Sequence, residues 1–414
     1  MFLLEINVFE SPSLVATPAA LPEAAPESVG LCPQRLAKLV AVLEAEVARQ
    51  RLPGAVALVA RHGKIVLHES VGALDPSTSA PMPNDAIFRI YSMTKPIVSV
   101  AVMMLMEQGK LLLSDPVAKH LPEFAHQKVT ALVDGTVQSQ AVRQPSTLHD
   151  LLRHTAGLTY EFMGSAPVQR QYAQLRIGSR ERTNASFSHE LASLPLMFEP
   201  GTVWEYGRAT DVLGRVVEVV SGQTLGEFLA SSIFKPLGMT ETWFAVPPAH
   251  HARIAEPFAR DPEGGSQMRL IDVRESAALE SGGGGLASTA LDYARFMQFM
   301  LNKGELHDVR LLGPRTVDFM TSDHLGDLPV NSGASRSLLP PGHGFGLGFA
   351  VRKSLGVDSV PGSVGTYFWG GMAGTTFFVD PAEDLFACLM LQAPNQREYY
   401  RMLFRDLVYA SLLD

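Results

Sequence analysis

Cysteine is scarce in this chain, and the signatures of several protein classes are missing. Among 414 residues only Cys32 and Cys388 occur, far apart in sequence, so a disulfide framework is not indicated. Two ordinary thiols favour a reducing compartment, although one bridge between them stays open. The sequence has no H-E-x-x-H motif and no cluster of cysteine and histidine, so we predict no metal site and no cofactor.

Positive charge is also in deficit. There are 34 Lys and Arg against 42 Asp and Glu, and no basic patch stands out, so nucleic acid is not an expected partner. No Lys or Arg precedes Arg35, and Glu5 and Glu10 interrupt the first apolar residues, which argues against a signal peptide and favours a cytoplasmic location. No run of 18 apolar residues occurs, so no membrane span is expected.

Hydrophobic residues make up 46% of the chain, and their periodicity changes along it. Residues 32–51 and 88–111 have the pattern of helices, and 54–72 reads as two strands joined by a tight turn at His62–Gly63. The middle contains helix-like segments between loops, and few strands suggest themselves there. After about residue 340 the pattern is that of strands, followed by a closing helix over 396–413.

This order predicts an α/β (α+β) fold, in which helices flank an antiparallel sheet of about five or more strands. Residues 1–25 would be an N-terminal extension. Residues 26–111 and 276–414 would form the sheet domain, with a mainly helical domain, 112–275, inserted between them. A helix is expected after Thr289 or Ser288 as the N-cap, and the glycines at 282–285 would let backbones approach closely.

The stretch Y-S-M-T-K-P (91–96) places Ser92 and Lys95 three positions apart before an apolar helix. On a helix this spacing puts both side chains on one face. A serine there lies near the positive end of the helix dipole, and its own N–H can stabilise an oxyanion. A lysine desolvated by the helix would have a lowered pKa and could activate the serine. The alternative is a helix start with a surface lysine.

The segment FRIYSMTKPIVSVAVMMLMEQGKLLLSDPVAKHLPEF resembles the serine beta-lactamase and penicillin-binding-protein superfamily, in its family VIII carboxylesterase branch. The resemblance continues through LHDLLRHTAGL, through 198–244, and through FWGGMAGTTFFVDP, covering nearly all of 26–414 in the expected order. It implies a beta-lactamase-like fold with the active site in the cleft between the two domains. It also implies that Ser92 is the acylated nucleophile.

The resemblance implies that Tyr206, in WEYGRATDVLG, is the partner of the Ser–Lys pair. A phenolate favoured by the lysine ammonium could act as general base and later as general acid. A half-buried structural tyrosine is the alternative. Arg208 stands where the family has Asn, and it could either enter the substrate pocket or pair with a carboxylate such as Asp211 or Glu205.

The resemblance places Trp369-Gly370-Gly371 where lactamases and peptidases of the superfamily have the K-T-G motif. An aromatic wall replaces the anion-binding lysine, which suits neutral esters, while the glycines allow close approach to the acyl group. A sheet-packing tryptophan with a bulge is the alternative. The resemblance implies that the N–H groups of Ser92 and Met372 form the oxyanion hole, and Tyr160 is a further candidate for lining the pocket.

These residues predict a serine carboxylesterase that hydrolyses short-chain, small-molecule esters through an acyl-enzyme on Ser92. Acyl transfer, as in the related fungal acyltransferases of statin biosynthesis, would use the same residues. Weak beta-lactamase or D-amino-acid peptidase activity and a non-catalytic binding protein are the other hypotheses. A triad using His149 or His154 is disfavoured, because the family segment HTAGL is a structural turn. A G-x-S-x-G elbow is lacking, which argues against an alpha/beta-hydrolase.

Overall fold

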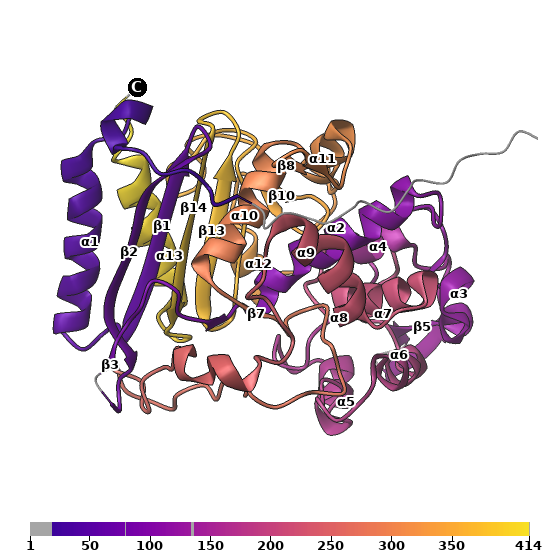
Figure 1. Ribbon diagram of the computed structural model, residues 1–414. Helices are drawn as coiled ribbons and strands as arrows, with labels where there is room; N and C mark the ends of the chain where they lie inside the picture. The colour runs from indigo at the N-terminus through magenta and orange to yellow at the C-terminus, as the bar shows by residue number, and fades with distance from the viewer. Residues whose placement is uncertain (1–18, 79, 134–135, 414) are drawn as a thin grey trace, which may run out of the picture.

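The computed structural model describes residues 19–78, 80–133 and 136–413. An eight-stranded antiparallel sheet, to which both ends of the chain contribute, forms one half of the molecule (Figure 1). In spatial order its strands are β10 (His343–Phe345), β11 (Ala350–Arg352), β12 (Tyr367–Gly370), β13 (Gly374–Asp380), β14 (Leu385–Gln392), β1 (Gly54–Arg61), β2 (Lys64–Asp75) and β3 (Ala80–Pro81). The predicted antiparallel sheet flanked by helices is confirmed.

The β1–β2 hairpin follows directly from its turn residues. His62 and Gly63 have φ angles of 52° and 72°, the left-handed values that a two-residue turn of this type needs. Strands β1 and β14 pair at the centre of the sheet, and every residue of both is buried. Because helices cover both faces, these strands are continuously apolar and do not alternate with polar residues.

Two layers of helices enclose the sheet. On one face α1 (Pro33–Ala48) packs beside α13 (Arg397–Tyr409) (Figure 1). The helices predicted over 32–51 and 396–413 are thus present. On the other face lies α10 (Ala290–Leu301), which contacts β14 and β1. Thr289 caps this helix, since its side chain accepts a hydrogen bond from the Asp292 N–H.

The remaining elements lie mostly in the middle of the chain. The α-helices of this middle part are α3 (Val117–His120), α4 (Leu148–Leu152), α5 (Pro167–Gln174), α6 (Asn184–Ser193), α7 (Ala209–Ser221), α8 (Leu225–Leu229) and α9 (Lys235–Leu237). A hairpin of β5 (Lys128–Val133) and β6 (Thr136–Ala141) was not predicted. Elsewhere in the described chain, β4 (Phe88–Arg89) pairs with β7 (Ala287–Ser288), and β8 (Glu305–Leu306) pairs with β9 (Val309–Arg310). Helices α11 (Pro314–Met320) and α12 (Ala334–Leu338) lie between β9 and β10 in the sequence.

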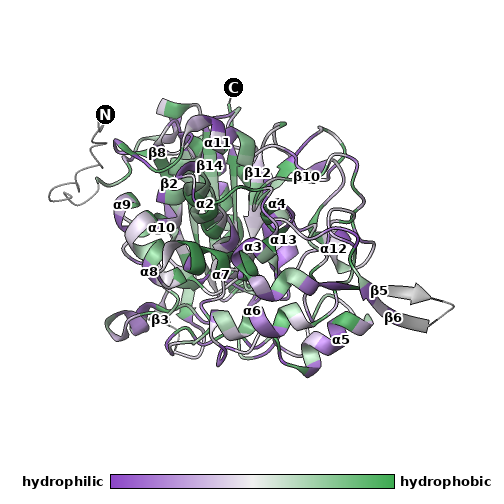
Figure 2. Ribbon diagram, turned by 90° about the vertical axis from the view of Figure 1, so that its right-hand side faces the viewer, coloured by the Kyte–Doolittle hydropathy of each residue, from purple (hydrophilic) through white to green (hydrophobic). Residues whose placement is uncertain are grey.

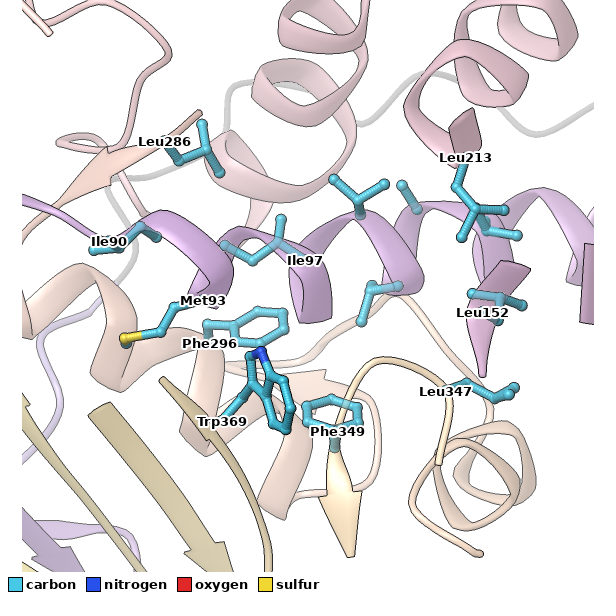
Figure 3. Packing of buried hydrophobic residues seen from close by; sticks show 14 of the residues in the cluster. Ile90, Met93, Ile97, Leu152, Leu213, Leu286, Phe296, Leu347, Phe349 and Trp369 are labelled. Carbon is cyan, nitrogen blue, oxygen red and sulfur yellow. The ribbon is translucent and has the colours of Figure 1, made fainter. Parts of the chain in front are cut away.

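Helix α2 (Thr94–Glu107) is the central element. It is buried from Thr94 to Leu105, and it is coloured as hydrophobic at the centre of Figure 2. The predicted helix over 88–111 is therefore shorter: β4 comes first, then a 3-10 turn over Tyr91–Met93. Figure 3 shows α2 running above a cluster that includes Phe296, Phe349 and Trp369.

One hydrophobic cluster includes side chains of α2, of the middle helix α7 and of the sheet. The boundaries of the predicted helical domain stay a prediction. Residues 1–18 of the predicted N-terminal extension lie outside the described residues, whereas Leu21 is buried and Glu23 pairs with Ile65 of β2. No helix in the described part of the chain has the length and apolar character needed to cross a membrane.

Candidate active site

Ser92 and Lys95 lie together where the 3-10 turn meets α2. The Lys95 Nζ is 3.1 Å from the Ser92 Oγ, so the predicted pair is in hydrogen-bond contact. Ser92 is partly exposed, whereas Lys95 is fully buried. Tyr91, just before the serine, has a φ of 42°, a left-handed conformation that is uncommon for a residue with a side chain. Because Lys95 is fully buried, the alternative of a helix start with a surface lysine is excluded.

The surroundings of Lys95 favour a neutral amine. Its Nζ also contacts the Gly283 carbonyl oxygen at 2.6 Å and the Tyr160 Oη at 3.0 Å. Burial lowers the pKa of Lys95 to about 7; the charge of Asp211 opposes this effect and that of Arg208 adds to it. A neutral amine has two N–H groups for Gly283 and Tyr160, and its lone pair then faces Ser92.

Tyr206 joins this group from the loop before α7. The Trp369 Nε1 donates a hydrogen bond to the Tyr206 Oη at 3.1 Å, and the Lys95 Nζ lies 4.5 Å from the centre of the Tyr206 ring. Both aromatic residues are almost completely buried. The fold therefore brings together four residues that the sequence had singled out, from segments as far apart as α2 and β12.

The ionisation of Tyr206 differs from the expectation. Burial raises its pKa above the usual value, and the hydrogen bonds with Ser92 and Trp369 and the charge of Arg401 only partly oppose this effect. The tyrosine is therefore neutral at rest, and the prediction that the lysine favours a resting phenolate is not supported. The group with a pKa near neutrality is Lys95.

Tyr160 contacts the lysine directly, a role that the sequence did not indicate. Its ring stacks on the exposed Phe162 ring with centroids 4.7 Å apart, and burial raises its pKa. The Gly283 N–H and the Ser281 hydroxyl both donate hydrogen bonds to Asp211 Oδ1. A side chain at position 283 would place its Cβ 2.7 Å from Asp211 Oδ2, which explains why this residue is a glycine.

Arg208 pairs with carboxylates. Its guanidinium contacts Glu161 and, at 3.4 Å, Asp211, and it lies 4.8 Å from the centre of the Tyr160 ring. Of the two carboxylate partners considered from the sequence, Asp211 is correct, while Glu205 instead binds Thr159, Asn331 and Ser335. A substrate-binding role for Arg208 stays a prediction.

Each glycine of the W-G-G motif makes room for a different neighbour. A Cβ at Gly371 would lie 2.5 Å from the Ile90 carbonyl oxygen, so this glycine lets the turn after β12 approach the segment that leads to Ser92. A Cβ at Gly370 would instead lie 2.6 Å from Arg401 Nη2. Met372 follows in a turn, and its N–H has no hydrogen-bond acceptor among the described residues. The oxyanion role of Met372 stays a prediction.

The two histidines of LHDLLRHTAGL (148–158), His149 and His154, are not bonded to Ser92 in the described structure. His149 Nε2 lies 2.9 Å from His324 Nδ1. His154 is buried with its ring 4.9 Å from that of Tyr206, and burial holds its pKa well below the ordinary value. Neither has the contacts of a catalytic base, in agreement with the interpretation of this segment as structural.

Comparison with known proteins places this constellation in a family. The family model described as Beta-lactamase matches residues 39–409, and the chain belongs to this family of serine enzymes. Esterase EstB of Burkholderia gladioli is 36% identical over 402 residues, covering 90% of this chain and 95% of EstB. Lovastatin esterase of Penicillium rubens is 31% identical, covering 80% of this chain and 86% of the relative.

Solved structures agree with the sequence relatives. EstCE1, described as a hydrolase with promiscuous acyltransferase activity, superposes with a TM-score of 0.76 at 30% identity, covering 91% of this chain and 99% of that chain. The family and the beta-lactamase-like fold expected from the sequence are confirmed.

Proposed function

We propose that this protein is a serine carboxylesterase that forms its acyl-enzyme on Ser92. The observation that carries the proposal is the contact of a partly exposed Ser92 hydroxyl with a fully buried lysine, beside the neutral Tyr206. The esterases among the relatives support the same class of reaction. A cytoplasmic location stays a prediction from the sequence.

In the proposed mechanism, neutral Lys95 is the general base. It takes the proton of the Ser92 hydroxyl as the oxygen attacks the ester carbonyl, while Gly283 and Tyr160 hold its two N–H groups in place. Tyr206, oriented by the Trp369 N–H, donates a proton to the departing alkoxide, and Lys95 restores that proton. Water then attacks the acyl-enzyme, with the same groups acting in reverse.

The proposed substrate is a neutral ester with a short acyl chain. The family resemblance places Trp369 at the position of the K-T-G lysine, and the Trp369 indole donates to Tyr206, so this position offers no fixed positive charge to an anionic substrate. The N–H groups of Ser92 and Met372 are the proposed oxyanion hole, in which developing negative charge is stabilised.

Acyl transfer to an alcohol is the second candidate, because the acyl-enzyme is common to both reactions. EstCE1, which resembles this chain over nearly its whole length, carries both activities in its description. Product analysis of p-nitrophenyl butyrate turnover, with and without an added alcohol, measures the partition between free acid and new ester.

The test of the proposal compares p-nitrophenyl butyrate with a cephalosporin. We expect turnover of the ester with a kcat/KM well above that for the cephalosporin, and its loss in Ser92→Ala. Faster cephalosporin turnover would replace the esterase assignment with a lactamase. Failure to turn over neutral esters of any acyl length would remove the assignment altogether.

A further inference from the structure

Arg401 of α13 reaches from the C-terminal helix to the turn after β12. Its Nη2 donates a hydrogen bond of 2.5 Å to the Gly371 carbonyl oxygen, and its Nη1 donates to Glu398 Oε1 at 2.8 Å. The side chain is only 19% exposed, although the helix lies on the far face of the sheet from α10. A largely buried guanidinium that ends on a backbone carbonyl beside the candidate site requires an explanation.

The Gly371 carbonyl and the Met372 N–H belong to the same peptide group. This peptide is planar and trans, so its C=O and N–H point in opposite directions. A guanidinium that holds the oxygen therefore fixes the direction of the N–H. The Gly374 N–H donates to the same oxygen at 3.1 Å, which closes the turn around this peptide.

The charge of Arg401 also acts on the peptide electronically. A hydrogen bond from a charged donor to a carbonyl polarises the peptide and makes its N–H a better donor, and the effect is stronger where water is excluded. The space for the guanidinium comes from Gly370, where a Cβ would lie 2.6 Å from Nη2 and 2.7 Å from Cζ. Gly370 of the W-G-G motif thus leaves room for the guanidinium of Arg401.

We infer that Arg401 is a positioning residue of the oxyanion hole: it orients and polarises the Gly371–Met372 peptide so that the Met372 N–H stabilises the tetrahedral intermediate. This inference rests on the proposed esterase function. A purely structural role, in which Arg401 only anchors α13 to the sheet, is the alternative. The two roles can be distinguished, because loss of oxyanion stabilisation weakens binding of the transition state more than binding of the ester substrate.

The test uses Arg401→Met and Arg401→Lys, with Arg397→Met as a matched control. Arg397 lies one turn earlier on α13 and pairs with the same Glu398, but it has no contact with Gly371. For each variant, kcat and KM are measured with p-nitrophenyl butyrate, and the active sites are titrated with a fluorophosphonate. Affinity is measured for a trifluoromethyl ketone, which forms an oxyanion when serine adds to it.

For Arg401→Met we expect kcat per titrated site to fall about 10- to 100-fold, somewhat less than when an oxyanion donor is removed outright, with KM nearly unchanged. Ketone affinity should fall by a similar factor, Arg401→Lys should recover part of both, and Arg397→Met should resemble the native protein. The inference is wrong if Arg401→Met matches Arg397→Met, or if its ketone affinity is unchanged when kcat falls. If the native protein hydrolyses no ester, the proposed function itself fails.

Discussion

Burial lowers the pKa of Lys95, and the charge of Asp211 raises it again in part, so Asp211 affects the pH at which the enzyme becomes active. Lys95 has a pKa of about 7 in the folded protein, and the proposed mechanism needs its neutral form. Activity should therefore rise with pH through about 7 and be lost below it, as the amine becomes protonated. Asp211 stabilises the protonated form, so Asp211→Asn should lower the pKa of Lys95 and move the acid limb of kcat/KM to lower pH.

The size of this movement follows from the contacts. Asp211 accepts from the Gly283 N–H and Lys95 contacts the Gly283 carbonyl, so one residue separates the two charges, a distance of roughly 7 Å. At an effective dielectric constant of about 20 their attraction is about 2 kcal/mol. The acid limb should therefore move down by about 1.5 pH units.

The assay is the pH dependence of kcat/KM for a p-nitrophenyl ester between pH 4 and 9, read at an isosbestic wavelength. Arg208→Met removes a cation that lowers the pKa of Lys95, so its acid limb should move the other way, to higher pH. Asp318→Asn is the control, because Asp318 pairs with Lys303 and Arg315 on the surface. An acid limb that stays in place or moves up in Asp211→Asn would refute the assignment of Lys95 as the base.

Two further substitutions test neighbouring parts of the site. Tyr206→Phe should lower kcat about 100- to 10,000-fold by removing the general acid, while fluorophosphonate titration still finds folded sites; retention of more than a tenth of the rate would contradict this role. Gly371→Ala should destabilise the protein by about 1–3 kcal/mol, since its Cβ would lie 2.5 Å from the Ile90 carbonyl, and denaturant unfolding measures the change. An unchanged midpoint with full activity would show that the close approach is dispensable.

The order of elements along the chain was sufficient to predict an antiparallel sheet with helices on its faces, whereas the beta-lactamase-like fold was expected from the family resemblance. Apolar periodicity and turn residues such as His62–Gly63 are local signals, so the strands near the two ends and the helices over α1 and α13 could be predicted. The β5–β6 hairpin could not be predicted, because its second strand, Thr136–Ala141, is largely polar. The late start of α2 depends on the left-handed Tyr91, a conformation that no residue preference indicates.

The core of the site was predictable only because the motifs occur in the family's order. Ser92, Lys95, Tyr206 and Trp369 lie together in the structure. The contacts of Tyr160 and Arg401 could not be predicted, since each depends on how distant segments pack and not on spacing. The raised pKa of Tyr206 likewise comes from burial by the folded chain.

The most direct test of the account is to identify the residue that acts as the nucleophile. After incubation with a fluorophosphonate and digestion with trypsin, the peptide from Ile90 to Lys110 contains both Ser92 and the buried Ser99, and fragmentation of this peptide by tandem mass spectrometry distinguishes them. We expect a single label on Ser92 and none in Ser92→Ala, which should also lose ester hydrolysis. Label on another residue, or full hydrolytic rate in Ser92→Ala, would contradict the proposed mechanism.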